Sequence, residues 1–317
     1  MSTNIQIIRS TDPISVEHPI FHIFGGPGLG KTSLAFSAPK PLLLNCDNES
    51  ALARAVNRRD SINVLTIDVL AAIIADPQSV FASFDTIAID PVGGFVDLLG
   101  ALLINENAKL GRSDGNLTQQ GYGALKTSFK SFMVSVKALG KNIFFVSHNK
   151  EDKAANDVVY NRPDITGGSK DIVMRWSDFV GFLRMDGKQR IIDFNPNEAY
   201  FAKNPRGLWK PWKVPPPEKA ADFMTKLFNE GRAELSKLSE SSASIAEQLE
   251  QWRARISAAT TAEQLNRILA EYRGLPPVLE PQVRAILRKR AEVLALDYDT
   301  TTKLFLEPET QPAGGVL

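Results

Sequence analysis

The residues best suited to chemistry are the ten from Phe24 to Ser33, which read FGGPGLGKTS. They satisfy every fixed position of the pattern G-x-x-x-x-G-K-[ST]. An apolar, β-prone stretch (Pro19–Phe24) precedes them and a helix-capable stretch (Lys31–Ser37) follows. Glycines in such a loop let successive backbone N–H groups turn inward around a phosphate at the start of a helix. The alternative is a glycine-rich turn without a ligand, and the strand–loop–helix context favours the phosphate site.

Two side chains of this loop are suited to a nucleoside triphosphate and its cation. We expect Lys31 to reach the β- and γ-phosphates and the Thr32 hydroxyl to bind Mg²⁺. The residues expected around the nucleotide are Gly26, Pro27, Gly28, Leu29, Gly30, Lys31, Thr32 and Ser33. The loop therefore predicts a site for ATP and Mg²⁺.

A second candidate is Asp90, which ends the apolar run Thr86–Asp90. A buried strand that ends in aspartate is the Walker B form, in which the carboxylate lies beside the phosphate loop and orients Mg²⁺. The alternative is a turn-forming aspartate, which is common after strands. Because Asp90 follows a strong phosphate loop, we predict that it acts in the reaction and shares the metal with Thr32.

Carboxylates also follow the apolar run Pro41–Cys46. Ligands of open α/β folds bind at the carboxyl ends of the strands. Hydrolysis needs a base to align the attacking water, and either Glu49 or Asp47 is suited to that role. In the alternative interpretation Asp47 or Asn48 caps the next helix and Glu49 lies in its first turn. Both interpretations can hold at once, with one of the two acids as the base and the other at the start of the helix.

The run Asn142–Ser147 ends in polar residues, followed by His148. If this strand lies between the two Walker strands, Ser147 and His148 are candidate sensors of the nucleotide state. The alternative is that His148 is an ordinary loop residue.

Composition narrows the classes of protein. The 317 residues are 43% hydrophobic and 23% charged, with a net charge of +1, so no overall basic excess indicates nucleic acid. No apolar run reaches the roughly 18 residues that cross a bilayer, and the first ten residues lack a signal-peptide core. The single cysteine, Cys46, excludes an internal disulfide, and one Cys with three His disfavours structural zinc. We expect a cytoplasmic protein without a membrane partner.

Short apolar runs alternate with helical stretches between Pro19 and Lys203, which predicts an α/β fold with a mostly parallel sheet and helices on both faces. The expected strands are Ile20–Phe24, Pro41–Cys46, Ile62–Ile67, Thr86–Asp90, Asn142–Ser147 and Phe179–Met185. The expected helices are Lys31–Ser37, Ser50–Arg58, Gly94–Ala108 and Tyr122–Leu139. A turn at Asp186-Gly187 and strands at Arg190–Phe194 and Tyr200–Lys203 predict a small antiparallel addition.

The run Val214-Pro215-Pro216-Pro217 predicts a stiff boundary, because proline interrupts helices and central strands. We expect an ATPase domain over residues 1–214, a helix and linker over 215–244 and a small helical domain over 245–300. The linker is the soft segment 239–244, and helices are expected at Glu218–Leu238, Ile245–Ala258, Ala262–Tyr272 and Glu280–Leu296. Residues 301–317 are expected to form a disordered tail.

The chain resembles known ATPases in several strings taken in order. Gly25–Thr32, Asp47-x-Glu49-x-Ala51-Leu52, Ile87–Asp90 and Phe144–Asn149 resemble the RecA/RadA branch of P-loop ATPases. More closely, residues from about 18 to 210 resemble the phage-encoded nucleotide-binding AAA family that contains the Sak-type, RecA-like single-strand annealing proteins. Further matching strings are Gln120–Gly123, Gly167–Lys170 and Ala202–Gly207. The helical region after Pro215 is not covered.

The resemblance implies a RecA-like core and assigns the catalytic carboxylate to Glu49. It implies that Lys203 and Arg206 reach the nucleotide of a neighbouring subunit, where the alternative is a pair of solvated loop charges. The polar loop Lys150–Lys170 matches loops that contact DNA, which makes Lys150, Lys153, Arg162 and Lys170 candidates for phosphate contacts. The alternative there is a mobile surface loop.

These residues together predict an Mg²⁺-dependent ATPase that acts on single-stranded DNA in phage recombination or annealing, in the host cytoplasm. It is expected to form a homo-oligomer, ring or filament, and a single-strand binding protein is a further partner that the resemblance suggests. The alternatives are an ATP-dependent interaction switch with little affinity for DNA, or another P-loop motor such as a helicase loader or packaging ATPase.

Overall fold

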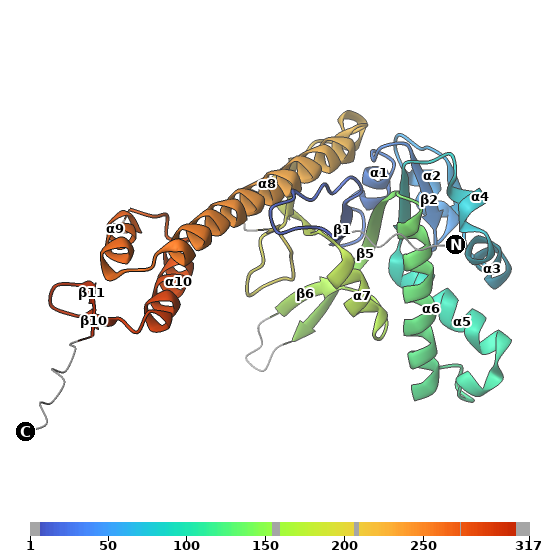
Figure 1. Cartoon of the computed structure of the whole chain (residues 1–317). Coiled ribbons are helices and arrows are strands. Elements are labelled where there is room, and N and C mark those ends of the chain that lie inside the picture. Colours follow the sequence, from blue (N-terminus) through green and yellow to red (C-terminus); the bar gives the residue numbers. More distant parts are fainter. Residues whose placement is uncertain (1–6, 154–158, 206–208, 273, 309–317) are drawn as a thin grey trace, which may run out of the picture. The chain divides into compact units, whose positions relative to one another are not determined.

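The computed structural model describes residues 7–153, 159–205, 209–272 and 274–308. The chain divides into two compact units, one from Val16 to Leu235 and one that joins the described parts of Met1–Ser15 and Ser236–Leu317 (Figure 1). The first unit is an α/β domain and the second is mainly helical.

The α/β unit contains the following strands and helices. Its strands are β1 (Ile20–Gly25), β2 (Pro41–Asn45), β3 (Ser61–Asn63), β4 (Thr86–Asp90), β5 (Asn142–Lys153), β6 (Val159–Pro163), β7 (Phe179–Asp186), β8 (Gln189–Asp193) and β9 (Trp212–Val214). Its helices are α1 (Lys31–Ala35), α2 (Glu49–Arg54), α3 (Ile67–Ala75), α4 (Pro77–Phe81), α5 (Val92–Glu106), α6 (Gln119–Ala138), α7 (Ser169–Trp176) and the first part of α8 (Phe223–Ala258). Short 3₁₀ turns lie at Ala108–Leu110 and Pro217–Lys219.

The strands listed above form one sheet in the order β3-β2-β4-β5-β1-β7-β8-β9, with β6 paired to β5. In this spatial order, neighbouring strands between β3 and β7 are parallel. Strands β8 and β9 then add antiparallel pairs. The register pairs Asn45 with Asp90 and Gly25 with His148. The carboxyl ends of β1, β2 and β4 and His148 of β5 therefore lie at one edge of the sheet.

The central strands are buried on both faces, as in sheets that carry helices on each side. Alternate residues point to opposite faces. Leu42, Leu44, Ile87, Ile89 and Phe145 pack with residues of α3, α5 and α6. Leu43, Ala88 and Phe144 pack on the other face with residues of α1 and α8. The predicted α/β fold with a small antiparallel addition is confirmed.

Several element boundaries differ from the expectation. The strand expected at Ile62–Ile67 ends at Asn63, and Ile67 begins α3 because the Thr66 hydroxyl accepts a hydrogen bond from the Val69 N–H. No strand forms at Tyr200–Lys203, where only isolated bridges occur. The polar loop expected at Lys150–Lys170 is largely structured. β5 continues to Lys153 and pairs antiparallel with β6, and α7 begins at Ser169.

Helix α8 crosses the segment where a linker was expected. Residues 239–244 are helical because their Ser, Glu and Ala side chains include no helix-breaking Gly or Pro. The first turns of α8 belong to the core of the α/β unit, where Phe223, Met224, Leu227 and Phe228 are buried. The α/β unit consequently extends past the expected boundary at residue 214, to Leu235.

The second unit contains the rest of α8 together with α9 (Ala262–Tyr272), α10 (Glu280–Val293), β10 (Asp297–Asp299) and β11 (Leu304–Leu306). The two strands pair antiparallel, so β11 lies inside the segment 301–317 where a disordered tail was expected, and 309–317 lie outside the described residues. No helix in the described ranges is both long and apolar enough to cross a membrane.

Candidate nucleotide-binding site

The phosphate loop connects β1 to α1 at the carboxyl edge of the sheet. Gly28 and Gly30 have φ angles of 74° and 81°, in the left-handed region that glycine adopts without steric cost. Gly30 is the N-cap of α1, and a Cβ atom there would lie 2.7 Å from Nη1 of Arg190. The Arg190 side chain is flexible enough to move aside, so the backbone angle is the feature that favours glycine at position 30.

Lys31 is the first residue of α1, and its side chain folds back over the loop. Its Nζ donates hydrogen bonds to the carbonyl oxygens of Gly25 (2.9 Å) and Gly26 (2.7 Å). Burial lowers the pKa of Lys31, and the nearby charge of Asp90 acts in the opposite direction. The ammonium group is thus held inside the loop, beside the carboxylate that ends β4.

Asp90 lies next to this lysine and is 8% exposed. Burial raises the pKa of its carboxyl group, while a hydrogen bond from the Thr32 hydroxyl and the charges of Lys31 and His148 act to lower it. The nearby Asp47 adds to the upward shift. Two acids, a hydroxyl group and a lysine therefore converge on one point at the sheet edge.

A cavity of about 310 Å³ opens over this cluster. Its lining residues are Pro27, Gly28, Gly30, Lys31, Thr32, Ser33, Asn45, Asp47, Ala51, Arg54, Ala55, Asp90 and His148. The structure thus brings together most of the residues that the sequence predicts around a nucleotide. Gly26 and Leu29 do not line the cavity. The Gly26 carbonyl binds Lys31, and the Leu29 carbonyl accepts a hydrogen bond of 2.8 Å from Arg190.

The donor set suits Mg²⁺. Thr32 and Asp90 offer hard oxygen atoms at the mouth of the phosphate loop, and no group of three or more His, Cys, Asp or Glu side chains in the described residues is arranged to hold a metal. Magnesium usually keeps several waters and binds through one or two carboxylates and substrate phosphates rather than in an all-protein cage. Thr32 and Asp90 are therefore adequate ligands only together with a nucleotide.

The two candidate bases lie in different places. Asp47 lines the cavity, whereas Glu49 is exposed in the first turn of α2 and accepts a hydrogen bond of 3.4 Å from Nδ2 of Asn63. Asn48 caps α2, since its side chain accepts a hydrogen bond from the Ala51 N–H (3.0 Å). The catalytic role of Glu49 stays a prediction, and the geometry favours Asp47 because this carboxylate lines the cavity.

Three residues near the site did not stand out in the sequence. Arg54 and Asn45 line the cavity, and the Arg54 guanidinium donates a hydrogen bond of 3.0 Å to the Ser50 hydroxyl. Arg54 lies five positions after Glu49, on the helix that follows β2. Its place in the sequence could therefore have indicated a cation near the site. Arg190 is separated from the loop by about 160 residues, and no local pattern marks it.

Lys203 lies away from the cavity. Its ammonium group donates to the carbonyl oxygens of Ser177 (2.5 Å) and Arg175 (3.3 Å), at the end of α7. Ser177 precedes β7, so this contact is near the amino ends of the parallel strands, opposite the phosphate loop. A cation is favourable at that helix end. Arg206 lies outside the described residues, and the action of both cations in a neighbouring subunit stays a prediction.

The candidate DNA-contacting residues cluster on and beside the β5–β6 hairpin. Arg162 forms an ion pair with Asp152 on the opposite strand, and Lys150 lies 3.8 Å from the Asp164 carboxylate. Arg162, Lys150 and Lys170 all lower the pKa of Asp152. Lys153 ends β5, and its side chain lies outside the described part of the structure. The cations are therefore grouped, with some of their charge already paired.

Comparison with known proteins decides the family. The family model described as "AAA domain" matches residues 18–206, which is more than half of the chain. The chain belongs to the AAA-domain family. No curated protein matches it.

The AAA domain of this protein includes β1 to β8 and therefore every residue of the phosphate-loop cavity. Members of this family are generally ATPases, which agrees with the predicted nucleotide site. The match ends before β9, α8 and the second unit, so the AAA domain says nothing about the function of the C-terminal helices.

Proposed function

We propose that this AAA-domain protein hydrolyses ATP with Mg²⁺ and uses the reaction in the annealing or recombination of single-stranded DNA. The observation that carries the proposal is the convergence of Lys31, Thr32 and Asp90 in one cavity at the end of the phosphate loop. This arrangement is the one that phosphoryl transfer from a nucleoside triphosphate requires.

Each residue has a distinct part in the proposed reaction. The loop backbone from Gly28 to Thr32 donates N–H groups to the phosphates, and Lys31 places a positive charge where negative charge grows in the transition state. Bound Mg²⁺ supplies further charge neutralisation on the phosphate oxygens. Asp47, or Glu49 after a small movement of α2, aligns the attacking water.

The DNA part of the proposal is supported by the resemblance to Sak-type annealing proteins and by the cations around Asp152. Phosphate backbones bind through such groups without sequence preference. A homo-oligomer, with Lys203 and Arg206 acting on a neighbouring nucleotide, belongs to the same proposal.

The test is the rate of ATP hydrolysis by the full-length protein with and without single-stranded DNA. We expect Mg²⁺-dependent hydrolysis that DNA accelerates, and no hydrolysis by the Lys31→Ala variant. Hydrolysis that DNA leaves unchanged would favour the second candidate, an ATP-dependent interaction switch. That candidate is supported by the helical C-terminal unit, which lies outside the AAA match. Absence of ATP binding would exclude both.

A further inference from the structure

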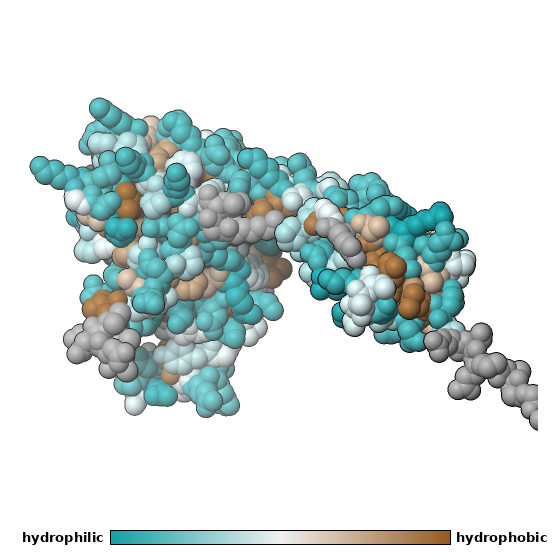
Figure 2. Space-filling view, turned by 90° about the vertical axis from the view of Figure 1, so that its left-hand side faces the viewer, coloured by the Kyte–Doolittle hydropathy of each residue, from teal (hydrophilic) through white to brown (hydrophobic). Residues whose placement is uncertain are grey.

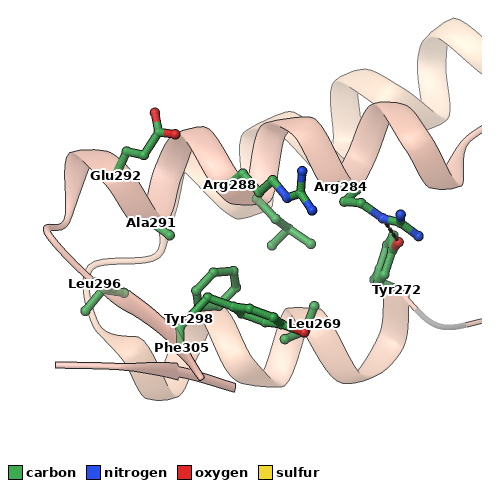
Figure 3. Close-up of a pocket in the computed structure, with 10 residues that line it drawn as sticks. Leu269, Tyr272, Arg284, Arg288, Ala291, Glu292, Leu296, Tyr298 and Phe305 are labelled. Atoms are coloured by element: carbon green, nitrogen blue, oxygen red, sulfur yellow. Dashed lines mark hydrogen bonds between the residues drawn. The ribbon is translucent and has the colours of Figure 1, made fainter. Parts of the chain in front are cut away.

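The C-terminal unit contains a cavity that the proposed reaction does not use. It has a volume of about 440 Å³ and lies between α9, α10 and the β10–β11 hairpin (Figure 3). It is outside the residues that the AAA family model matches. We propose that this cavity binds an acidic segment of a partner protein that carries one large apolar side chain.

The inner wall of the cavity is apolar. It is formed by Leu269 from α9, Leu287 and Ala291 from α10, Leu296, and Phe305 from β11. Leu287, Ala291 and Phe305 also belong to the core of this unit, so the wall is continuous with packed side chains. A surface of this kind gains free energy when an apolar side chain displaces water from it.

The rim of the cavity has one positive charge that the protein leaves available. Arg284 is occupied, because its Nε donates to the Tyr272 hydroxyl (2.5 Å) and its guanidinium pairs with Glu280. Arg288, one turn further along α10, is exposed and has no hydrogen bond or ion pair with any residue in the described ranges. Figure 3 shows the Glu292 carboxylate turned away from the other labelled side chains. A carboxylate at the rim would therefore meet Arg288 without competition.

The wall on the hairpin side is held in place before any partner binds. The Asn266 side chain pairs with the backbone of Phe305, donating to its carbonyl and accepting from its N–H, both at 2.8 Å. Glu307 accepts a hydrogen bond of 3.1 Å from the Ala262 N–H at the start of α9. Because these contacts fix the hairpin on α9, little conformational entropy is lost when the cavity is filled.

The balance of apolar and charged groups favours a peptide over nucleic acid. A phosphate backbone needs a series of cations, whereas one unpaired arginine next to an apolar wall matches a carboxylate beside an apolar side chain. Brown, apolar residues lie among teal ones on this unit in Figure 2. On the hairpin, Tyr298 lines the same cavity, is 49% exposed and would extend the contact along a bound segment.

The experiment measures the fluorescence anisotropy of a labelled ten-residue peptide, made of Asp and Ser with one central Phe, on addition of the full-length protein. We expect saturable binding that weakens at least tenfold in Arg288→Ala. Lys289→Ala is the matched control, since Lys289 is an exposed neighbour on α10 that does not line the cavity, and it should change the affinity less than twofold. Peptides with Ser in place of Phe, or Asn in place of Asp, should bind at least tenfold more weakly.

Three outcomes would overturn the proposal. The first is no saturable binding of the acidic peptide by the parent protein. The second is an equal loss of affinity in Arg288→Ala and Lys289→Ala, which would indicate general attraction between charges. The third is that Arg288→Ala weakens binding of an oligothymidylate and leaves peptide binding unchanged, which would assign this face to nucleic acid.

Discussion

Nη1 of Arg190 donates a hydrogen bond of 2.8 Å to the carbonyl oxygen of Leu29, so a side chain of β8 contacts the backbone of the phosphate loop. The same guanidinium group binds the carbonyl oxygen of Pro215, just after β9. Burial lowers the pKa of Arg190, with Glu218 acting in the opposite direction. The antiparallel addition to the sheet is thereby joined directly to the nucleotide site.

Arg190→Ala should weaken ATP binding about tenfold, because the Leu29 carbonyl loses its charged partner and the loop is less well ordered before binding. The dissociation constant, measured by isothermal titration calorimetry, checks this. Lys188→Ala is the control, since Lys188 is exposed in the β7–β8 turn. Equal affinities for the two variants would show that Arg190 does not position the loop.

Lys31→Ala should abolish ATP binding, with a loss of at least a hundredfold, and leave the protein folded. The lysine is the cation that we propose for the β- and γ-phosphates, and its ammonium group contacts carbonyl groups of the loop, so the apolar core should keep its packing without it. Calorimetry measures the binding and thermal unfolding measures the fold, with Lys40→Gln as a control for charge. ATP turnover at the parental rate in Lys31→Ala would end the nucleotide-site assignment.

Replacement of the two candidate bases separates their roles. We expect Asp47→Asn to bind ATP but hydrolyse it at least a hundredfold more slowly, because Asp47 lines the cavity and an amide does not accept a proton from water. If Glu49→Gln has this effect instead, α2 must move when nucleotide binds, since Glu49 is exposed in the structure. Single-turnover rates at saturating ATP distinguish the two results.

Binding of single-stranded DNA should become less sensitive to salt when Lys150 and Lys170 are both changed to Gln. Loss of two phosphate contacts on a single strand reduces the slope of log K against log salt by about 1.4. The slope is measured by anisotropy of a labelled oligonucleotide. Lys109→Gln with Lys130→Gln, which removes two exposed lysines from other elements, should leave it unchanged. A similar decrease in both double variants would remove the hairpin from the DNA-binding surface.

Stability should depend on pH through His22, which is fully buried in β1 and lies 2.7 Å from the Ser147 hydroxyl through Nε2. Burial lowers the pKa of His22 to about 3. Below pH ~6.5 the unfolded chain therefore binds a proton that the folded chain does not, so the free energy of unfolding falls as pH decreases.

Between pH 7.5 and 5 this loss should reach about 2 kcal/mol. Denaturant unfolding of His22→Leu should lack this part of the pH dependence, and Ser147→Ala, which keeps the histidine, should retain it. The same decrease in His22→Leu as in the parent protein would assign the titration to another group.

Local patterns in the sequence were sufficient for the phosphate loop and for the strands that end beside it. Gly28, Gly30 and Lys31 act through backbone conformation and short-range contacts, which depend on neighbouring residues. β4 has the predicted bounds Thr86–Asp90, because its apolar run and terminal aspartate belong to one short segment. The family match then agreed with the fold that these elements predict.

Tertiary structure decided which polar residues face the cavity. Asp47 and Glu49 are two positions apart, and the resemblance assigned the base to Glu49, whereas the cap formed by Asn48 and the position of α2 leave Asp47 at the cavity. Lys203 was expected to act on a neighbouring nucleotide or to be a solvated loop charge, and in the fold it donates hydrogen bonds to carbonyl groups at the end of α7.

The sequence alone thus determined the α/β fold and predicted a nucleotide site at the edge of its sheet. It did not determine the support of that site by Arg190 or the cavity beside Arg288. Both depend on contacts between side chains that only the packing of the whole unit brings together. No short stretch of the sequence indicates such contacts.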